Sequence, residues 1–337
     1  MPRMTFARAI DHALEMAMAS DERIIVLGED VTMLRRNLFV RFGPRRVRQT
    51  PISEAAFLGA GVGAAMAGLR PLVEIMLVDF IAVAYDALLN EASKVRAFSG
   101  GKWGVPLVVR AACGGGYGDG GQHEQCLWGM LAGMPGLSVV VPSNPADAAG
   151  LMLSALACDD PVVFLEHKLL SDYWLDYLGG ASRDTVSFDV PAAGAEGEVE
   201  APPRPVPIGE GRVAAEGSDL SIFGLGVSLH RCLEALPSLA AEGIKAEVVD
   251  LRSVAPLDRE LVVSSARRTG RALVVDEDYL GFGLSGEIAA VLAEAGLKVD
   301  FARVCTEDVI PFARRLEDEA LPNVHRIVEA AFDLASG

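Results

Sequence analysis

The sequence predicts an α/β protein made of two parallel-sheet domains. Short apolar runs, each long enough for one buried strand, alternate with segments in which apolar residues recur at helical spacing. This alternation indicates parallel strands covered by helices on both faces. It stops once, at residues 189–211, where Pro, Gly, Ala and Glu are concentrated, and then resumes. Such a composition is typical of a linker between domains.

The first domain is predicted at residues 1–188. Pro51 excludes a helix immediately before Glu54, and a helix rich in Ala and Gly follows. Asn144-Pro145 is a typical helix start. The predicted helices are 6–18, 55–69, 81–98, 127–134 and 145–157, and the predicted strands are 23–27, 72–78, 107–110, 137–141 and 162–165.

After the linker at 189–211, a smaller α/β domain is predicted at residues 212–337. Its apolar runs again alternate with helical segments, which end near residues 236, 266 and 295. The predicted strands are 220–223, 246–249, 272–275 and 298–302.

Composition indicates a folded cytoplasmic protein. Hydrophobic residues make up 51% of 337 residues, enough for a core, and the net charge of −16 argues against nucleic acid or an anionic membrane as the main partner. The five cysteines show no metal-ligand or disulfide spacing, so we expect reduced thiols in or near the core. The N-terminus has no signal pattern. Acidic residues interrupt the most apolar stretch, 72–89, which excludes a membrane span.

Two glycine motifs imitate cofactor sites. Gly59-x-Gly61-x-Gly63 lacks the preceding strand that a dinucleotide fingerprint requires, so we interpret it as close packing of the helix against a neighbour. Gly118-Asp119-Gly120 imitates a magnesium–diphosphate motif, with Asn144 downstream. It lies inside a Gly-rich loop, however, and does not close a buried strand, so we expect no metal there.

Glu54 and His123 are the candidate catalytic residues. Glu54 lies between a rigid Pro-containing segment and an apolar helix of small residues, where poor hydration would raise its pKa; it could equally be an ordinary acid at a helix N-terminus. His123 follows a Gly-rich loop predicted to be mobile, and is either an acid/base or oxyanion partner or a plain surface histidine. His167 is a weaker candidate. The basic stretch 35–48 is either a solvated loop or a surface for a phosphate or a partner.

Several motifs in register resemble the β subunits of thiamine-diphosphate-dependent 2-oxo acid dehydrogenases. The resemblance runs from about Met4 to Ala331 and is closest to the pyruvate and acetoin branches. The motifs are Thr50-Pro51-Ile52-Ser53-Glu54, Glu74–Phe80, Asn90–Lys94, Gln122-His123-Glu124-Gln125, Pro135-Gly136-Leu137, Phe164–Leu170, Val249–Arg252, Pro256-Leu257-Asp258 and Val275-Asp276-Glu277.

The resemblance implies a pyrimidine-binding domain followed by a C-terminal transketolase-like domain. It also implies roles in cofactor binding and catalysis. Glu54 matches the carboxylate that hydrogen-bonds to the cofactor's pyrimidine ring nitrogen and so favours the imino tautomer, Phe80 matches the ring that stacks on the pyrimidine, and His123 matches the histidine that faces the substrate and the lipoyl group. Glu29 matches an acid near the cofactor.

Partners follow from the same resemblance. A separate α subunit would hold the diphosphate and Mg²⁺ in an α₂β₂ heterotetramer, so no metal ligand is assigned to this chain. A lipoyl acyltransferase would accept the acyl group after decarboxylation of a small 2-oxo acid. An alkali ion, K⁺ in relatives, would lie near the strand at 162, where Asp159 and Asp160 are available.

Two departures concern the substrate. The segment between Asp30 and Phe42 is shorter and more basic than in the family, and Glu124 replaces a small hydroxyl residue beside the histidine. If Glu124 faced the substrate, it would disfavour an anion there.

Three other functions compete with this interpretation. A transketolase-like transfer of a two-carbon ketol unit from a sugar phosphate to a lipoyl or acyl-carrier domain would use the basic stretch. A non-catalytic scaffold subunit would leave Glu54, Phe80 and His123 without a role. An NAD-binding dehydrogenase would bind its cofactor without a partner chain.

Overall fold

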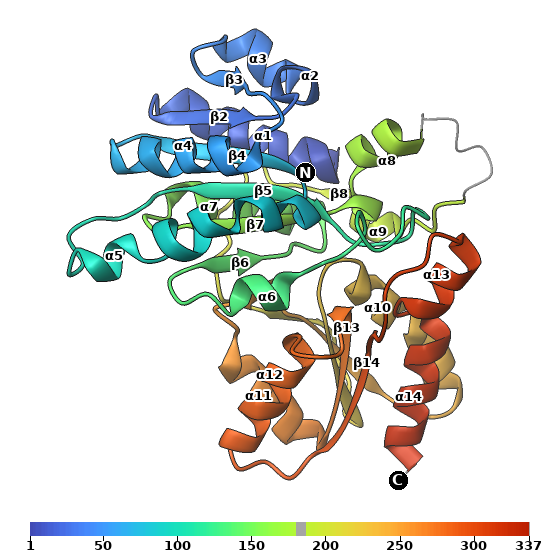
Figure 1. The fold of residues 1–337 in the computed structure, drawn as a ribbon. Helices are drawn as coiled ribbons and strands as arrows, with labels where there is room; N and C mark the ends of the chain where they lie inside the picture. Colours follow the sequence, from blue (N-terminus) through green and yellow to red (C-terminus); the bar gives the residue numbers. More distant parts are fainter. Residues whose placement is uncertain (180–186, 337) are drawn as a thin grey trace.

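The fold consists of two large sheets joined by a shared core. A computed structural model describes residues 1–179 and 187–336. A seven-stranded sheet has the order β12-β6-β7-β5-β4-β2-β3, and a five-stranded sheet has the order β14-β13-β10-β11-β9 (Figure 1). The predicted α/β class with largely parallel sheets is therefore confirmed.

Six strands of the seven-stranded sheet run parallel. β12 (Ser253–Ala255) comes from beyond the predicted linker and pairs antiparallel with β6 at the edge. The parallel strands are β2 (Ile24–Gly28), β3 (Val47–Gln49), β4 (Arg70–Leu77), β5 (Val108–Cys113), β6 (Ser138–Val140) and β7 (Val162–His167).

Both faces of the seven-stranded sheet are largely apolar, because successive apolar residues of its strands point to opposite sides. In β2, Ile24 and Val26 pack with residues of α1 (Phe6–Ser20) and α7 (Pro145–Ala157), whereas Ile25 and Leu27 pack with α4 (Glu54–Met66) on the opposite face. Successive side chains of a strand point to opposite faces, so both sides are buried by helices. Asn144 caps α7 by accepting the amide of Asp147 at 3.0 Å, as predicted for this helix start.

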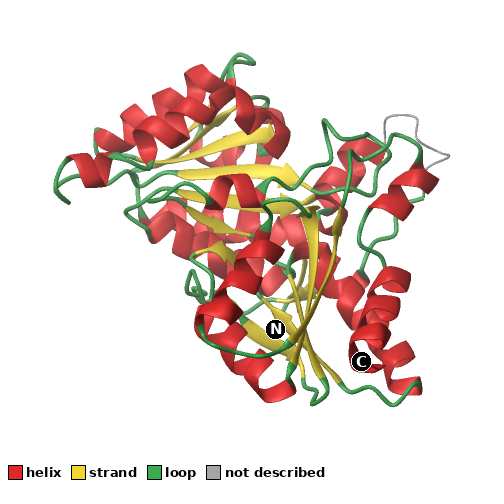
Figure 2. Cartoon of the chain, turned by 60° about the horizontal axis from the view of Figure 1, so that its bottom comes forward, coloured by secondary structure: helices red, strands yellow, loops and turns green. Residues whose placement is uncertain are grey.

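The five-stranded sheet is built in the same way. Its inner strands are parallel, and β9 pairs antiparallel at the edge. Its strands are β9 (Arg212–Ala215), β10 (Leu220–Gly224), β11 (Ala246–Asp250), β13 (Arg271–Tyr279) and β14 (Asp300–Thr306); its helices are α10 (Gly226–Ala241), α11 (Arg259–Thr269), α12 (Leu284–Glu294) and α14 (Val324–Ser336). Figure 2 shows both sheets between their helices.

One hydrophobic cluster runs through both sheets. Phe223 and Val249 of the second sheet belong to the same cluster as Val73 and Leu165 of the first. The two halves are also tied at the predicted linker, where β8 (Glu196–Glu198) pairs antiparallel with β1 (Arg3–Thr5) at the N-terminus. The short helices are α2 (Val31–Leu34), α3 (Arg36–Phe42), α5 (Val95–Phe98), α6 (Trp128–Ala132), α8 (Asp172–Gly179), α9 (Ala192–Ala195) and α13 (Arg314–Ala320).

The predicted helix at 81–98 is not a continuous α-helix. The chain forms a 3₁₀ segment, η1 (Val78–Ala84), a π segment, η2 (Ala87–Ala92), and then α5. The 3₁₀ segment starts directly after β4, so the chain turns tightly at the carboxyl end of that strand. Short 3₁₀ and π turns of this kind recur where a chain must place particular side chains.

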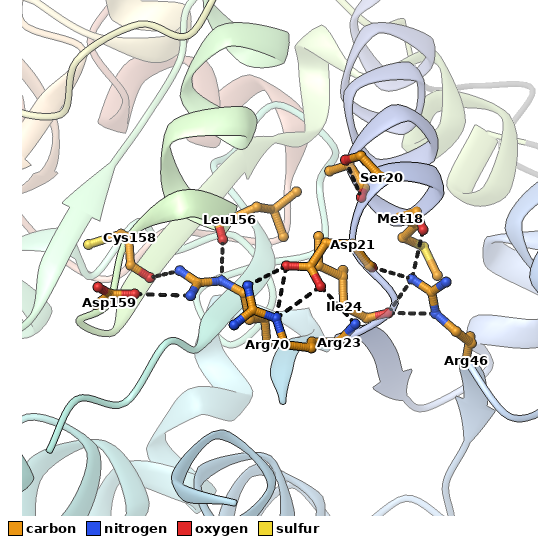
Figure 3. Close-up of polar contacts among 11 residues, drawn as sticks. Met18, Ser20, Asp21, Arg23, Ile24, Arg46, Arg70, Leu156, Cys158 and Asp159 are labelled. Atoms are coloured by element: carbon orange, nitrogen blue, oxygen red, sulfur yellow. Dashed lines mark hydrogen bonds and ion pairs between the residues drawn. The ribbon is translucent and has the colours of Figure 1, made fainter. Parts of the chain in front are cut away.

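The basic stretch 35–48 is folded, which corrects its interpretation as a solvated loop. It contains α3 and the first two residues of β3; Arg35 is buried, whereas Arg36, Arg41, Arg45 and Arg48 are exposed. Figure 3 shows Arg46 donating to three main-chain oxygens between Met18 and Ile24, at 2.7–2.9 Å. Arg46 therefore serves backbone groups at the amino ends of the strands, at the edge away from the candidate site.

Two further expectations concern the whole chain. All five cysteines are free, and four of them are buried, as predicted. Within the described residues, no helix combines the length and apolar character that a membrane crossing needs.

Candidate functional site

The sequence-predicted site residues gather at one edge of the seven-stranded sheet. Parallel strands present their carboxyl ends at the same edge, where ligands of open α/β sheets bind. Each candidate follows a different strand: Glu54 follows β3, Glu29 follows β2, Phe80 follows β4, His123 follows β5 and His167 ends β7. The strand order therefore brings together residues that lie more than 130 positions apart.

Glu54 and Glu29 form an acidic pair at this edge. Glu54 begins α4, and its side chain is half-buried in the single chain, which is less burial than the sequence suggested. Partial burial raises the pKa of Glu29, and the neighbouring charges of Asp30 and Glu54 raise it further. The charge of Glu54 is thus close enough to oppose the ionisation of Glu29.

Phe80 and His123 are in direct contact. Their ring centroids lie 5.9 Å apart at an interplanar angle of 83°, an edge-to-face arrangement. Phe80 lies in η1, which the packed helix α4 supports. The neighbouring Asp79 accepts a hydrogen bond from the side-chain amide of Gln125 at 2.7 Å. This bond ties η1 to the segment that carries His123. An aromatic face and an imidazole thus lie side by side at the sheet edge.

The Gly-rich loop before His123 is anchored, whereas the sequence predicted a mobile loop. Three buried carboxylates from different elements accept its main-chain amides. Glu277 of β13 accepts from Gly115 at 2.7 Å. Glu317 of α13 accepts from Gly116 at 2.6 Å and Gly118 at 3.0 Å, and Glu124 accepts from Tyr117 at 2.7 Å and Gly120 at 2.8 Å.

Glu124 does not face the site, which corrects the expectation that it would repel an anionic substrate. Its side chain is 0% exposed and points at loop amides. Burial raises its pKa to about 8, and a hydrogen bond to Glu317 adds to the effect. Lys168 is also fully buried; it donates to the main-chain oxygen of His123 at 2.6 Å, and burial lowers its pKa.

His167 is part of the framework behind the loop. Its Nε2 lies 2.9 Å from a carboxylate oxygen of Glu277, and both side chains are buried. Burial alone would raise the pKa of Glu277, but His167 and the Gly115 amide hold it below its usual value. A β-carbon at Gly114 would lie 2.0 Å from the His167 ring, so the loop packs onto this histidine at its base.

Sequence reasoning missed Glu317, Glu277 and Lys168. Glu277 lies in a quoted motif and Lys168 follows His167, so weak signals existed for both. Glu317 is about 200 positions from the amides that it binds, and nothing in its neighbourhood signals that contact.

The predicted alkali-ion ligands are ion-paired with arginines. Asp159 lies 2.9 Å from Arg70, a contact visible in Figure 3, and Asp160 pairs with Arg96. Within the described residues, no group of three or more His, Cys, Asp or Glu side chains could hold a metal ion. The Gly118-Asp119-Gly120 motif lies in the anchored loop, after β5 and before α6.

Two family models match the chain. The transketolase pyrimidine-binding domain matches residues 3–172, and the transketolase C-terminal domain matches residues 209–327.

Curated relatives align over nearly the whole chain. The β subunit of acetoin:2,6-dichlorophenolindophenol oxidoreductase from Cupriavidus necator is 36% identical, covering 98% of this chain and 96% of that protein. The mitochondrial pyruvate dehydrogenase E1 component subunit beta from Dictyostelium discoideum is 37% identical (97% and 90%), and the 2-oxoisovalerate dehydrogenase subunit beta from Bacillus subtilis is 36% identical (99% of each).

Among solved structures, an inactive β4 tetramer of a split-gene transketolase has a TM-score of 0.79. It shares 24% identity, covering 99% of this chain and 98% of that one. This similarity supports the fold.

Proposed function

Because the chain belongs to the family of β subunits of 2-oxo acid dehydrogenases, we propose that it forms, with an α subunit, a thiamine-diphosphate-dependent enzyme that decarboxylates or cleaves a small pyruvate- or acetoin-type donor. The acyl group passes to a lipoyl carrier. The observation that carries this proposal is the convergence of Glu54, Glu29, Phe80 and His123 on one sheet edge.

The residues at this edge fit the pyrimidine half of thiamine diphosphate. We propose that the aromatic face of Phe80 stacks on the pyrimidine ring and that the Glu54 carboxylate accepts a hydrogen bond from its ring nitrogen; the contact of Phe80 with His123 and the position of Glu54 at the start of α4 support this. When bound, the cofactor would supply a nucleophilic carbon for chemistry at the carbonyl group of the donor. Glu54 holds the proton on the ring nitrogen and so maintains the reactive tautomer, while Phe80 excludes water.

His123 is proposed to donate a hydrogen bond to the donor's oxygen as negative charge develops there. Its main-chain oxygen is fixed by Lys168 and its ring by the edge contact with Phe80, so the imidazole is oriented before a substrate arrives. Preorganised donors of this kind stabilise developing charge without reorganisation during the reaction.

The described chain does not enclose the candidate site in either of its two large hollows, which supports completion by the α subunit. The candidate residues line neither of two large hollows in the described chain, of about 730 and 830 Å³. Along α4, a β-carbon at Gly59 or Gly63 would meet nothing within 4 Å, although at Gly61 it would lie 2.5 Å from Val73. Nearby, Ile52 is 73% exposed and Met66 52% exposed.

We propose that the α subunit packs on this face of small and apolar residues, beside Glu54, and supplies the groups for the diphosphate and Mg²⁺. Close backbone approach is the usual reason for glycine inside a helix, where it costs about 1 kcal/mol relative to Ala.

Transfer of a ketol unit from a sugar phosphate remains a second candidate, although two of the six arginines in the basic stretch are already occupied. Within the basic stretch, Arg35 is buried with carboxylate partners and Arg46 is bound to main-chain oxygens. Neither guanidinium is available to a phosphate, whereas Arg36, Arg41, Arg45 and Arg48 are exposed, so the substrate survey decides between the two functions.

The test is to co-purify the chain with an α-type subunit and to assay pyruvate, acetoin, 2-oxoisovalerate and a ketose phosphate. Thiamine diphosphate and Mg²⁺ are added, with dichlorophenolindophenol as electron acceptor. We expect turnover of one of the first three donors, and a loss of about 100-fold or more in the Glu54→Gln variant. The exposed Glu22→Gln variant, at the opposite edge of the sheet, is the control. Full activity of Glu54→Gln would favour a scaffold role, and exclusive use of the ketose phosphate would favour ketol transfer.

A further inference from the structure

We propose that Glu124 and Glu317 share one proton and act together as positioning residues for His123, so that loss of this proton releases the loop and sets the alkaline limit of activity. The role of His123 rests on the proposed function, but the shared proton and its hold on the loop do not.

The two carboxyl groups bind alternating amides of the same short loop. Gly116 and Gly118 donate to Glu317, and Tyr117 and Gly120 donate to Glu124, with N–O distances of 2.6–3.0 Å. Both side chains are 0% exposed. Because neighbouring main-chain amides of the loop donate to different acids, the carboxyl groups of Glu124 and Glu317 lie close together.

The carboxyl groups also hydrogen-bond to each other. Two carboxylates are acceptors only, so a hydrogen bond between them requires one proton. Water does not reach this pair, and ionisation of both acids would leave two negative charges adjacent in a buried site.

The other charges around the pair do not remove this conflict. Lys168 approaches from η3 (Lys168–Leu170), and its ammonium group is occupied by the His123 main-chain oxygen and the Tyr117 ring. Arg314 lies 3.1 Å from Glu317, but it also pairs with Asp318. Further negative charge comes from Glu277, which is paired with His167, and from Asp119 in the loop. The two cations, Lys168 and Arg314, are therefore outnumbered by the acids around the pair.

The loop transmits the state of this pair to His123. Glu124 holds the amide of Gly120, and the main-chain oxygen of Gly120 accepts the amide of His123 at 3.0 Å. The peptide of His123 is also the anchor for Lys168. Separation of Glu124 from Glu317 would thus shift the residues that set the position of the imidazole against Phe80.

The pH at which this happens follows from burial. Burial and the bond to Glu317 raise the pKa of Glu124 to about 8, above the usual value of a glutamate. The shared proton holds the loop most strongly below the usual pKa of a glutamate. This hold weakens as the pH rises and is lost once the pH passes about 8, where both acids are charged and repel each other. The acid that limits activity at high pH is then Glu124, and not the imidazole that touches the substrate.

Hydrogen exchange measured by mass spectrometry tests the loop without any substrate. The full chain, alone and with its α-type partner, is measured from pH 5 to 9.5, and rates are corrected for intrinsic exchange. We expect the amides of 114–121 to lose protection by up to about tenfold per pH unit as the pH rises towards 8, and the loss to level off above about pH 8 in the wild type. Glu124→Gln and Glu317→Gln should show no such extra loss, because a glutamine cannot release the proton. Glu319→Gln, exposed on the same helix, should behave as wild type.

A pH profile of kcat/KM, with pyruvate, acetoin and 2-oxoisovalerate as donors, tests the link to His123. The pH above which kcat/KM falls should be higher in Glu124→Gln and in Glu317→Gln than in the wild type. It should be unchanged in Glu319→Gln. Protection that is independent of pH in the wild type, or the same pH dependence in the wild type and both variants, would overturn the shared proton. Normal exchange behaviour without turnover of any donor would instead overturn the proposed function.

Discussion

Nε2 of His167 lies 2.9 Å from a carboxylate oxygen of Glu277, and this pair joins the two sheets directly behind the candidate site. His167 ends β7 in the first sheet, and Glu277 lies on β13 in the second. Because Glu277 also accepts the amide of Gly115, the loop that leads to His123 depends on both sheets. Stability and site geometry are therefore linked at this contact.

Replacing Glu277 with Ala should lower the free energy of unfolding by about 2–4 kcal/mol. The change leaves the buried imidazole and the Gly115 amide without their partner, and unsatisfied buried polar groups are costly. Urea denaturation measures the effect. The exposed Glu287→Ala variant should cost less than about 1 kcal/mol. Equal effects of the two variants would contradict a structural role for the His167–Glu277 pair.

A buried ion network under α1 should respond strongly to loss of one charge. Arg35 bonds to Glu74 at 2.9 Å, and Arg110 bonds to Glu166 at 2.8 Å, with all four side chains buried. Glu74→Ala should destabilise the chain by about 3–5 kcal/mol, because Arg35 loses its hydrogen-bonded carboxylate and keeps only the more distant Asp11, at 3.6 Å, and Glu166, at 4.0 Å.

The double variant Arg35→Met/Glu74→Leu should recover much of that loss, since two apolar residues need no partner. Denaturation midpoints of the single and double variants give the comparison. A double variant that is less stable than Glu74→Ala would show that packing, and not charge pairing, sets the stability of this network.

Two glycines of α4 should differ in what an added methyl group does. Gly61→Ala should destabilise the chain by about 1–3 kcal/mol, because the new β-carbon would lie 2.5 Å from Val73. Gly63→Ala should stabilise the isolated chain by up to about 1 kcal/mol, since that position is open and Ala favours helix.

Assembly with the α subunit should reverse the benefit at Gly63, because the proposed partner approaches that face. Thermal melting of the isolated chain and size-exclusion chromatography of the mixture separate the two effects. Normal assembly of Gly63→Ala would argue against a partner at this position.

Asp276 should make stability fall as the pH rises towards neutrality. Burial raises its pKa to about 7, and Trp128 donates to it at 2.9 Å. Since its pKa is higher in the folded state than in the unfolded state, its contribution is fully present below about pH 3.8 and is lost as the pH rises through about 7.

Asp276→Asn removes this ionisation, so the variant should gain stability relative to the wild type, by roughly a few kcal/mol, between pH 4 and 7.5. Denaturation at several pH values tests this. A constant difference between the two proteins would show that Asp276 ionises at similar pH in both states.

Local sequence signals predicted much of the fold. The helix at 145–157 was predicted to the residue, because Asn144 caps it and Pro145 suits its first turn. The strand at 162–165 was found from its run of apolar residues, and the close packing predicted for the α4 glycines is found at Gly61. These features depend on neighbours in the chain, which a single sequence displays.

Long-range contacts were not predictable in the same way. The contact of Glu317 with the Gly-rich loop depends on how α13 returns to the first sheet. The charge of Arg35 suggested an exposed side chain, because the sequence does not show that Glu74 lies beside it. Glu54 and His123 were candidates from their local sequence, and the family motifs added Phe80. Their position at one edge depends on strand order, which no single segment encodes.

The antiparallel edge strand β12 has a consequence for dissecting the protein. It begins at Ser253, beyond the linker, yet it covers β6 at the rim of the first sheet. A fragment that ended at the linker would leave the backbone groups of β6 unpaired, and such exposed rims invite intermolecular pairing. We therefore expect the two halves to melt in a single cooperative transition, and the truncated N-terminal half to aggregate when it is expressed by itself.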